Sequence, residues 1–199
     1  IRRPHRSKRF HYTTLFRSVG KTTFLRHLAK KDRTYVTLDD PLVRTLAKED
    51  PALFFQRFPP PLLIDEIQYA PELLPHIKME VDRRQKQGLF WLTGSQHFHL
   101  MKGVSESLAG RIGVVQLLGL SWRELAGQSR ASRPFLPTAS EIRSRIKGGS
   151  QLTLKELYRR IWRGTFPRIA LDEKIDRDLF YGSYIQTYIQ RDIRDLARV

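Results

Sequence analysis

Short runs of apolar residues, each ended by polar or acidic residues, recur along the chain and predict the strands of a sheet. Leu62-Leu63-Ile64 is apolar at consecutive positions, as in a central strand that is buried on both faces of a parallel sheet. Patterns with helical spacing separate the runs, so we predict an α/β protein with three layers, in which helices cover a parallel sheet. The four runs lie at 34–38, 62–66, 89–93 and 114–118.

The C-terminal third has helical patterns and no further run of this kind. Ser121 with Glu124, and Thr153 with Glu156, have the spacing of capping boxes at helix starts. A stretch rich in Arg, Ser, Pro and Gly separates these two helices and predicts a linker. The last helical pattern reaches Val199 without a cap, so we expect a truncated domain there. The predicted parts are a core domain over 19–126, a linker over 127–150 and the start of a helical domain over 151–199.

The first helical pattern follows the end of a phosphate-binding motif. Gly20-Lys21-Thr22 matches the last three positions of G-x-x-x-x-G-K-[ST]. In that motif the glycine lets the backbone approach the phosphates, the lysine neutralises their oxygens and the hydroxyl holds Mg²⁺. The first glycine of the motif is replaced by Leu15, and a Gly-Lys-Thr triplet can also be a plain helix cap. The candidate nucleotide-binding residues are Val19, Gly20, Lys21, Thr22 and Thr23, and Thr22 is also a candidate metal ligand.

Two adjacent carboxylates end the second apolar run. Asp65 is a candidate Mg²⁺ ligand, and Glu66 is a candidate base that orients and deprotonates a water attacking the γ-phosphate. The alternative is a strand followed by a capped helix. The third run ends in a similar way, and Thr93, Ser95 or Gln96 could reach the γ-phosphate or the attacking water. We select Ser95 as the candidate there, and a plain turn is the alternative.

Arg111 precedes the fourth apolar run and is a candidate catalytic residue. An arginine can stabilise the charge of a phosphoryl-transfer transition state, within its own chain or toward a neighbour. A solvent-exposed surface arginine is the alternative interpretation. His97 and His99 alternate, but no further ligand lies at metal-binding spacing, so a metal site is not expected there.

The overall charge suggests a nucleic-acid partner, but its distribution weakens that interpretation. The chain has a formal net charge of +16. Residues 1–33 hold 11 Lys and Arg and one acid, which gives +10, and the rest of the chain contributes only +6. The absence of cysteine fits a reducing compartment, and no apolar run reaches the roughly 18 residues that span a bilayer. We therefore expect a cytoplasmic protein without a membrane segment.

The basic N-terminal stretch has two explanations. Tyr12–Ser18 resembles one reading frame of a common sequencing-adapter oligonucleotide. We therefore hypothesise that 1–18 are adapter-derived codons fused to a gene fragment that begins near Val19. The alternative is a natural basic arm, with a strand over 10–18 that leads into the phosphate loop.

These motifs, taken together, resemble the AAA-type P-loop ATPases of the prokaryotic group in which the ATPase domain precedes an uncharacterised helical domain. Leu15, Phe16 and Ser18 differ from the phosphate loop of that group, whereas Arg17 agrees with it. The stretches that carry the resemblance are Val19–Thr23, Tyr35–Asp40, Leu62–Gln68, Leu92–Gln96, Ser107–Arg111, Gly164–Pro167 and Thr187–Asp192.

The resemblance implies a five-stranded parallel sheet, a site for ATP with Mg²⁺, and hydrolysis. Lys21 and Thr22 are implied to bind phosphate and Mg²⁺, Asp65 to bind Mg²⁺, and Glu66 to act as the base. Two other hypotheses stay open. The chain could be a nucleic-acid-binding module on a degenerate ATPase scaffold, suggested by the basic residues between Arg130 and Arg163, or an inactive ATPase fragment. A nucleic-acid or protein partner and an oligomer are compatible with the sequence.

Overall fold

The computed structural model describes residues 19–29, 32–94, 107–127, 137–148 and 152–188. These residues belong to two compact units, one formed by Gly20–Leu117 and the other containing Leu118–Val199. We describe each unit separately.

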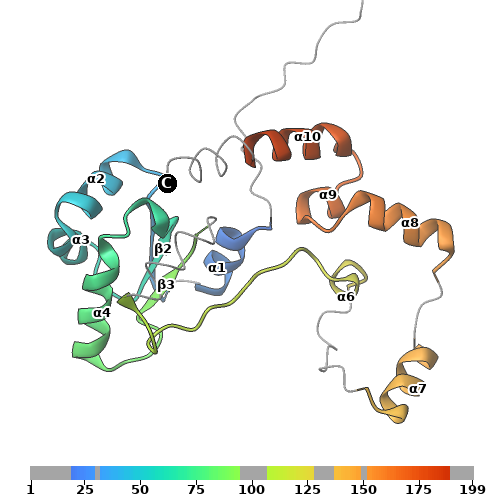
Figure 1. Ribbon diagram of the computed structural model, residues 1–199, viewed down its shortest axis with the longest axis horizontal. Helices are drawn as coiled ribbons and strands as arrows, with labels where there is room; N and C mark the ends of the chain where they lie inside the picture. Colours follow the sequence, from blue (N-terminus) through green and yellow to red (C-terminus); the bar gives the residue numbers. More distant parts are fainter. Residues whose placement is uncertain (1–18, 30–31, 95–106, 128–136, 149–151, 189–199) are drawn as a thin grey trace, which may run out of the picture. The chain divides into compact units, whose positions relative to one another are not determined.

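The Gly20–Leu117 unit is built on a parallel sheet of three strands, β1 (Thr34–Thr37), β2 (Leu62–Asp65) and β3 (Phe90–Leu92), in the order β1-β2-β3 (Figure 1). Helices lie between successive strands in the chain, which is the connection that parallel pairing requires. The register pairs Thr37 with Asp65 and Ile64 with Leu92, so the C-terminal ends of neighbouring strands lie at one edge of the sheet.

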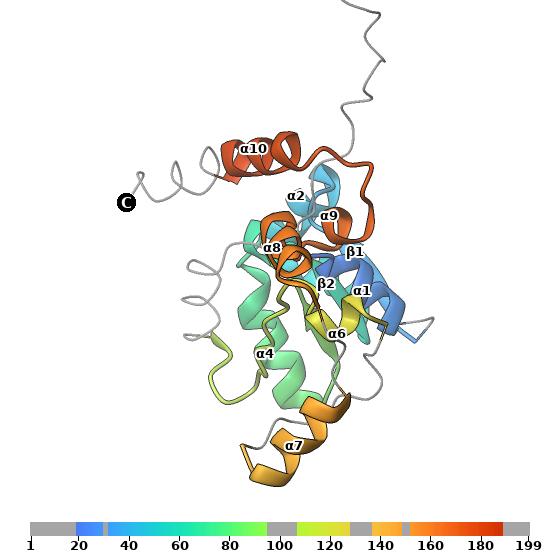
Figure 2. The same cartoon turned by 90° about the vertical axis from the view of Figure 1, so that its right-hand side faces the viewer.

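Helices cover both faces of this sheet. The helix α1 (Lys21–Ala29) lies on one face, and α2 (Pro41–Glu49), α3 (Pro51–Arg57) and α4 (Leu73–Arg84) lie on the other, as Figures 1 and 2 show. A 3-10 turn, η1 (Ile67–Tyr69), joins β2 to α4. The main core fills the space between the sheet and the second group of helices, and its fully buried members include Leu38, Phe54, Leu62, Ile64, Ile67 and Leu73. This architecture confirms the predicted α/β class with a parallel sheet.

Side-chain caps fix where the helices on the core side begin. Asp40 accepts hydrogen bonds from the backbone N–H groups of Leu42 and Val43 at the start of α2. Asp50 accepts one from the N–H of Leu53 at the start of α3. Proline occupies the first position of both helices, where its missing N–H group is not needed. Asp40 and Asp50 are therefore the N-caps of α2 and α3.

The fourth predicted strand, Val114–Leu118, is wrong. These residues have no strand geometry, and Val115 is 90% exposed. A strand forms only when a neighbour completes its backbone hydrogen bonds, and in the described residues β3 is paired with β2 alone. The five strands that the resemblance implied are therefore three in the part of the chain that the structure describes. The strand predicted over 10–18 lies outside the described residues.

The Leu118–Val199 unit is helical. Ser121 and Glu124 form a complete capping box at the start of α6, and Thr153 and Glu156 form one at the start of α8, so both predicted helix starts are confirmed. The stretch predicted as a linker includes a helix, α7, in which an ion pair between Glu141 and Arg145, one turn apart, adds to the stability of the helix. The helices are α6 (Trp122–Leu125), α7 (Ala139–Gly148), α8 (Leu154–Arg163), α9 (Pro167–Leu171) and α10 (Arg177–Tyr188).

The turn between α8 and α9 is the packing centre of this unit. Gly164 has a φ of +83°, which favours glycine, and a Cβ at this position would lie 2.0 Å from the Tyr181 hydroxyl oxygen. The Phe166 ring contacts the rings of Phe180, Tyr181 and Tyr184. The longest helices in the described residues have 12 residues, and none has the length and apolar character needed to cross a membrane.

Candidate functional site

The carboxylate of Asp65 is the centre of a buried polar cluster at the C-terminal edge of the sheet. Asp65 is the last residue of β2 and is 0% exposed. The Thr22 hydroxyl donates to both of its oxygens, at 2.9 and 3.0 Å. The Tyr35 hydroxyl donates to Oδ2 at 2.9 Å, and the Thr93 hydroxyl donates to Oδ1. A buried carboxylate needs such donors because it has lost its water.

The beginning of α1 brings residues of the predicted phosphate loop to this carboxylate. Lys21 is the first residue of α1, and Thr22, which follows it, is 7% exposed and contacts Asp65 directly. Gly20 has a φ of +78°, in the region that favours glycine, and nothing lies within 4 Å of the place that a Cβ would occupy. The Gly20 carbonyl accepts the first hydrogen bond of the helix, from the N–H of Phe24 at 2.9 Å.

The same arrangement presents an anion site. The first N–H groups of a helix have no partner within the helix, and the helix dipole is positive at that end. The helix α1 has nine residues, follows a glycine and begins with Lys21. It therefore combines these features with the positive charge of a flexible lysine side chain. Thr23 is exposed on this helix and Val19 is half-buried before it.

Glu66 follows Asp65 in a left-handed backbone conformation, with φ 60° and ψ 47°. This conformation is uncommon for a residue with a side chain and tends to occur where function requires it. The Gln68 amide donates to Oε2 of Glu66, and the backbone N–H of Glu66 points to the Thr93 hydroxyl at 3.4 Å. Glu66 is half-buried, next to Asp65 in the chain.

Sequence reasoning named Thr93 with Ser95 and Gln96 and selected Ser95, which lies outside the described residues. The structure places Thr93, 4% exposed, between the two acidic residues. It also adds Tyr35, which sequence reasoning missed. The alternation of β1 puts Tyr35 and Thr37 on one face of the sheet, but the register that aligns this face with Asp65 is not visible in the sequence.

Arg111 is not brought to the Asp65 cluster. Its guanidinium pairs with Asp82 at 2.6 Å and also donates to the Ala109 carbonyl. The hydrogen bond from Arg111 lowers the pKa of Asp82 and raises that of Arg111 itself. Asp82 lies near the C-terminal end of α4, about 13 Å along the helix from Leu73, which follows the acidic strand end.

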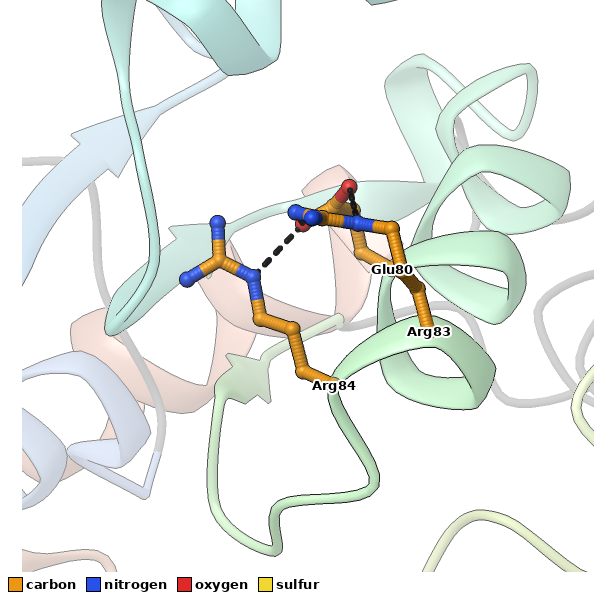
Figure 3. A network of polar contacts seen from close by, with 3 residues as sticks. All are labelled: Glu80, Arg83 and Arg84. Carbon is orange, nitrogen blue, oxygen red and sulfur yellow. Dashed lines mark hydrogen bonds and ion pairs between the residues drawn. The ribbon is translucent and has the colours of Figure 1, made fainter.

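The end of α4 where Arg111 is held is rich in ion pairs. Glu80 accepts hydrogen bonds from both Arg83 and Arg84, at 3.0 and 2.8 Å, as Figure 3 shows. These contacts keep the pKa of Glu80 below its usual value, mainly through the bond from Arg83. Arg111 forms its ion pair, with Asp82, at the same end of α4.

A cavity of about 1140 Å³ runs along the outer edge of β3, between α1 and α4. Its walls are mostly apolar, and they include Phe24 and Leu28 of α1 and Val81 of α4. Lys21 and Thr93 line it at the end where the Asp65 cluster lies. A triphosphate needs donors and positive charge, and besides Lys21 the cavity is lined by Lys86 and Arg111.

Thr22 and Asp65 offer the hard oxygen atoms that Mg²⁺ prefers. Because the Thr22 hydroxyl donates its proton to Asp65, the lone pairs of its oxygen stay free for a cation. Within the described ranges, no group of three His, Asp or Glu side chains could hold a metal alone. A Mg²⁺ ion at this position would therefore take its other ligands from phosphate oxygens and water, as Mg²⁺ commonly does. The residues fit the ion.

Several basic residues of the Leu118–Val199 unit are used in contacts within the unit. Some form ion pairs, which neutralise their charge, and others cover aromatic rings or bind backbone carbonyls. These contacts involve part of the positive charge that suggested a nucleic-acid partner. The contacts are Arg145 with Glu141, Arg159 with Glu173, Arg160 over Trp122, Arg163 with the Ile169 carbonyl, and Arg177 over Trp162.

Comparison with known proteins gives two family matches. Residues 16–126 match the model of a family described as an AAA domain, and residues 154–199 match one described as a domain of unknown function (DUF8612). An uncharacterized protein of Mycobacterium bovis and one of Mycobacterium tuberculosis are each 30% identical to the chain over 182 residues. The match covers 91% of this chain and 35% of each relative, so the chain spans about a third of their length. No solved structure matches the chain significantly.

Proposed function

Because the chain belongs to the AAA domain family, whose members are nucleotide-binding, ATPase-like proteins, we propose that it binds ATP with Mg²⁺ and hydrolyses it by in-line attack of water. One observation carries the proposal. The Thr22 hydroxyl lies 2.9 Å from the Asp65 carboxylate, so the end of the phosphate loop and the acidic strand end meet at one point. Ligands of open α/β sheets bind at the C-terminal ends of the strands, where this contact lies.

Each residue at this point has a role in the proposal. Lys21 and the first N–H groups of α1 neutralise and orient the phosphate oxygens. Thr22 and Asp65 hold Mg²⁺, which when bound neutralises charge on the β- and γ-phosphates. Glu66 orients the attacking water and takes its proton. Catalysis then comes mainly from positioning and electrostatic stabilisation.

Two predicted residues keep narrower roles. Ser95 is proposed to contact the γ-phosphate or the attacking water from the segment that follows β3. Arg111 is proposed to sense the γ-phosphate, within its own chain or in a neighbouring molecule, and it lines the same cavity as Lys21. We also propose that 19–126 is the ATPase core and that a helical domain begins near 151.

The test separates nucleotide binding from turnover in the full chain. Lys21→Ala should weaken ATP binding and turnover together, because it removes the charge that meets the phosphates. Glu66→Gln should leave binding nearly unchanged and lower turnover about 100-fold or more, the usual size of a general-base effect. The measurements are radiolabelled-ATP turnover and equilibrium binding of a fluorescent ATP analogue.

The matched controls for this test lie on the opposite face of the sheet. Lys48→Ala and Glu49→Gln make the same chemical changes at exposed positions of α2. Both should keep the binding and turnover of the unmodified chain. Equal turnover rates in Lys21→Ala, Glu66→Gln and the controls would contradict the proposal.

Leu15 gives a further test of the phosphate loop. Leu15→Gly restores the first glycine of the motif, so it should strengthen ATP binding if the loop is the binding element. Combining it with Lys21→Ala should remove that gain. A gain that persists in the double variant would mean that the added glycine acts elsewhere.

A further inference from the structure

Tyr35 links two structural elements to the acidic residue of the site. It lies on β1, and its hydroxyl donates to Oδ2 of Asp65 at 2.9 Å. The guanidinium of Arg26 lies over its ring, 4.7 Å from the centroid. Arg26 and Thr22 are four residues apart on α1, so they lie on one face of that helix. Helix α1 is therefore linked to Asp65 in two ways. Thr22 contacts Asp65 directly, and Arg26 contacts Tyr35, which in turn contacts Asp65.

The hydrogen bonds at the carboxylate show what Tyr35 adds. The single proton of Thr22 is shared between the two carboxylate oxygens, at 2.9 and 3.0 Å, and Thr93 donates to Oδ1. Tyr35 adds a third hydroxyl donor, which is directed at Oδ2 from a different strand. The last torsion of an Asp side chain is soft, so the Tyr35 hydroxyl helps to set the orientation of the carboxylate.

We propose that Tyr35 is a positioning residue for the Mg²⁺ site, and that its hydroxyl holds the Asp65 carboxylate in the orientation that binds the ion. The role rests on the proposed function. Partners that orient a metal ligand usually change metal affinity 10- to 100-fold when they are removed. The Arg26 guanidinium keeps the Tyr35 ring in place, so α1 transmits the position of the phosphate loop to the carboxylate.

The experiment titrates the metal at saturating ATP in the full chain. Tyr35→Phe removes one oxygen and keeps the ring under Arg26, so it should raise the Mg²⁺ concentration for half-maximal turnover about tenfold. At excess Mg²⁺, the KM for ATP and the kcat should return close to those of the unmodified chain. Binding of Mn²⁺ with ADP, followed by electron paramagnetic resonance, should weaken by the same factor and needs no turnover.

Two further variants test whether the contact of Arg26 with Tyr35 affects the metal dependence, and whether removing a tyrosine hydroxyl elsewhere has no effect. Arg26→Leu removes the cation from the ring but leaves the hydroxyl, so it should shift the metal dependence in the same direction and by less. Tyr158→Phe makes the same deletion at a residue of α8 that is 64% exposed, and it should change nothing. Thermal unfolding of each variant identifies a loss of fold, which would lower kcat at every Mg²⁺ concentration.

The outcomes distinguish this role from the proposed function. An unmodified chain that binds nucleotide with Mg²⁺, with the same metal dependence in Tyr35→Phe, would overturn the role of Tyr35 alone. A chain without any Mg²⁺-dependent nucleotide binding would overturn the proposed function and this role with it. A tenfold shift in both the turnover and Mn²⁺ measurements supports the role.

Discussion

Phe54 and Ile161 are both large apolar residues on short helices, yet they have opposite environments. Phe54 of α3 is 0% exposed, within the core of the Gly20–Leu117 unit. Ile161 of α8 is 65% exposed, and other apolar residues of that helix are exposed with it. In the first unit the apolar residues fill a core beside a sheet, whereas among the described residues of the second only a few, such as Ile169 and Phe180, reach full burial.

Both units contain rings that pack together and rings that lie under arginines, but the extent of burial differs. In the first unit, Phe54 packs against Phe55 and Phe58 within the core. In the second, Trp162 is 54% exposed and its ring lies under the Arg177 guanidinium. A cation over an exposed ring contributes about 0.5–1 kcal/mol, less than burial of an aromatic side chain. The comparison teaches that the sheet unit has the larger reserve of stability, and three sets of substitutions probe the two units.

The largest expected effect comes from truncation of the two apolar residues just compared. Phe54→Ala should destabilise the first unit by about 4 kcal/mol, because it leaves a cavity in a close-packed core. Ile161→Ala should change stability by less than about 0.5 kcal/mol, as exposed positions do. Urea unfolding followed by circular dichroism measures both, and amide exchange of β2 locates the loss. Equal losses in the free energy of unfolding for the two truncations would contradict the inferred difference in stability between the units.

A smaller effect is expected at the turn of the second unit. Gly164→Ala should cost about 2 kcal/mol or more, because it combines a left-handed backbone with a clash against Tyr181. Gly127→Ala is the matched control, since Gly127 has a φ of +70° but nothing within 4 Å of its Cβ position. It should cost only about 1 kcal/mol. Thermal unfolding measures both, and similar costs would show that the Tyr181 contact is unimportant.

The smallest expected effect concerns the capping box of α8. Thr153→Ala should destabilise the helix by about 1 kcal/mol at neutral pH, and Thr153→Ser should not. The hydrogen bonds from Thr153 lower the pKa of the Glu156 carboxyl. Glu156 therefore contributes stability above its ordinary pKa of about 4.3, and this contribution is lost as the pH falls through the lowered value in the folded chain.

The pH dependence of thermal unfolding checks this last prediction. The difference between the unmodified chain and Thr153→Ala should be largest near pH 7 and should shrink below about pH 4, where Glu156 becomes protonated in both states. A difference that stays constant down to pH 3 would assign the effect of Thr153 to its hydroxyl alone.

The sequence predicted the parts of the fold that depend on local patterns. The apolar run of β2 and the capping boxes of α6 and α8 are visible in a few consecutive residues, and the structure confirms them. Val114–Leu118 has the same apolar character as β2 and is not a strand. A strand depends on a neighbour elsewhere in the chain, which no local pattern reports.

The candidate site likewise has contacts that the sequence predicts and contacts that it does not. The pairing of Thr22 with Asp65 could be anticipated from motifs that are known to act together. Tyr35 and Thr93 could not be assigned to Asp65, because their contacts depend on the register of β1 and β3 against β2. The partner of Arg111 could not be predicted either, since Asp82 lies 29 residues away, on α4.

The hydroxyls of Thr22, Tyr35 and Thr93 reach Asp65 across 43, 30 and 28 residues of chain. A nascent polypeptide cannot complete this cluster until Thr93 has left the ribosome and all three strands have docked. A ligand that requires the finished cluster would then bind only molecules that have folded through β3, and would stabilise them by mass action. Maturation of the sheet and readiness for a ligand would be the same event.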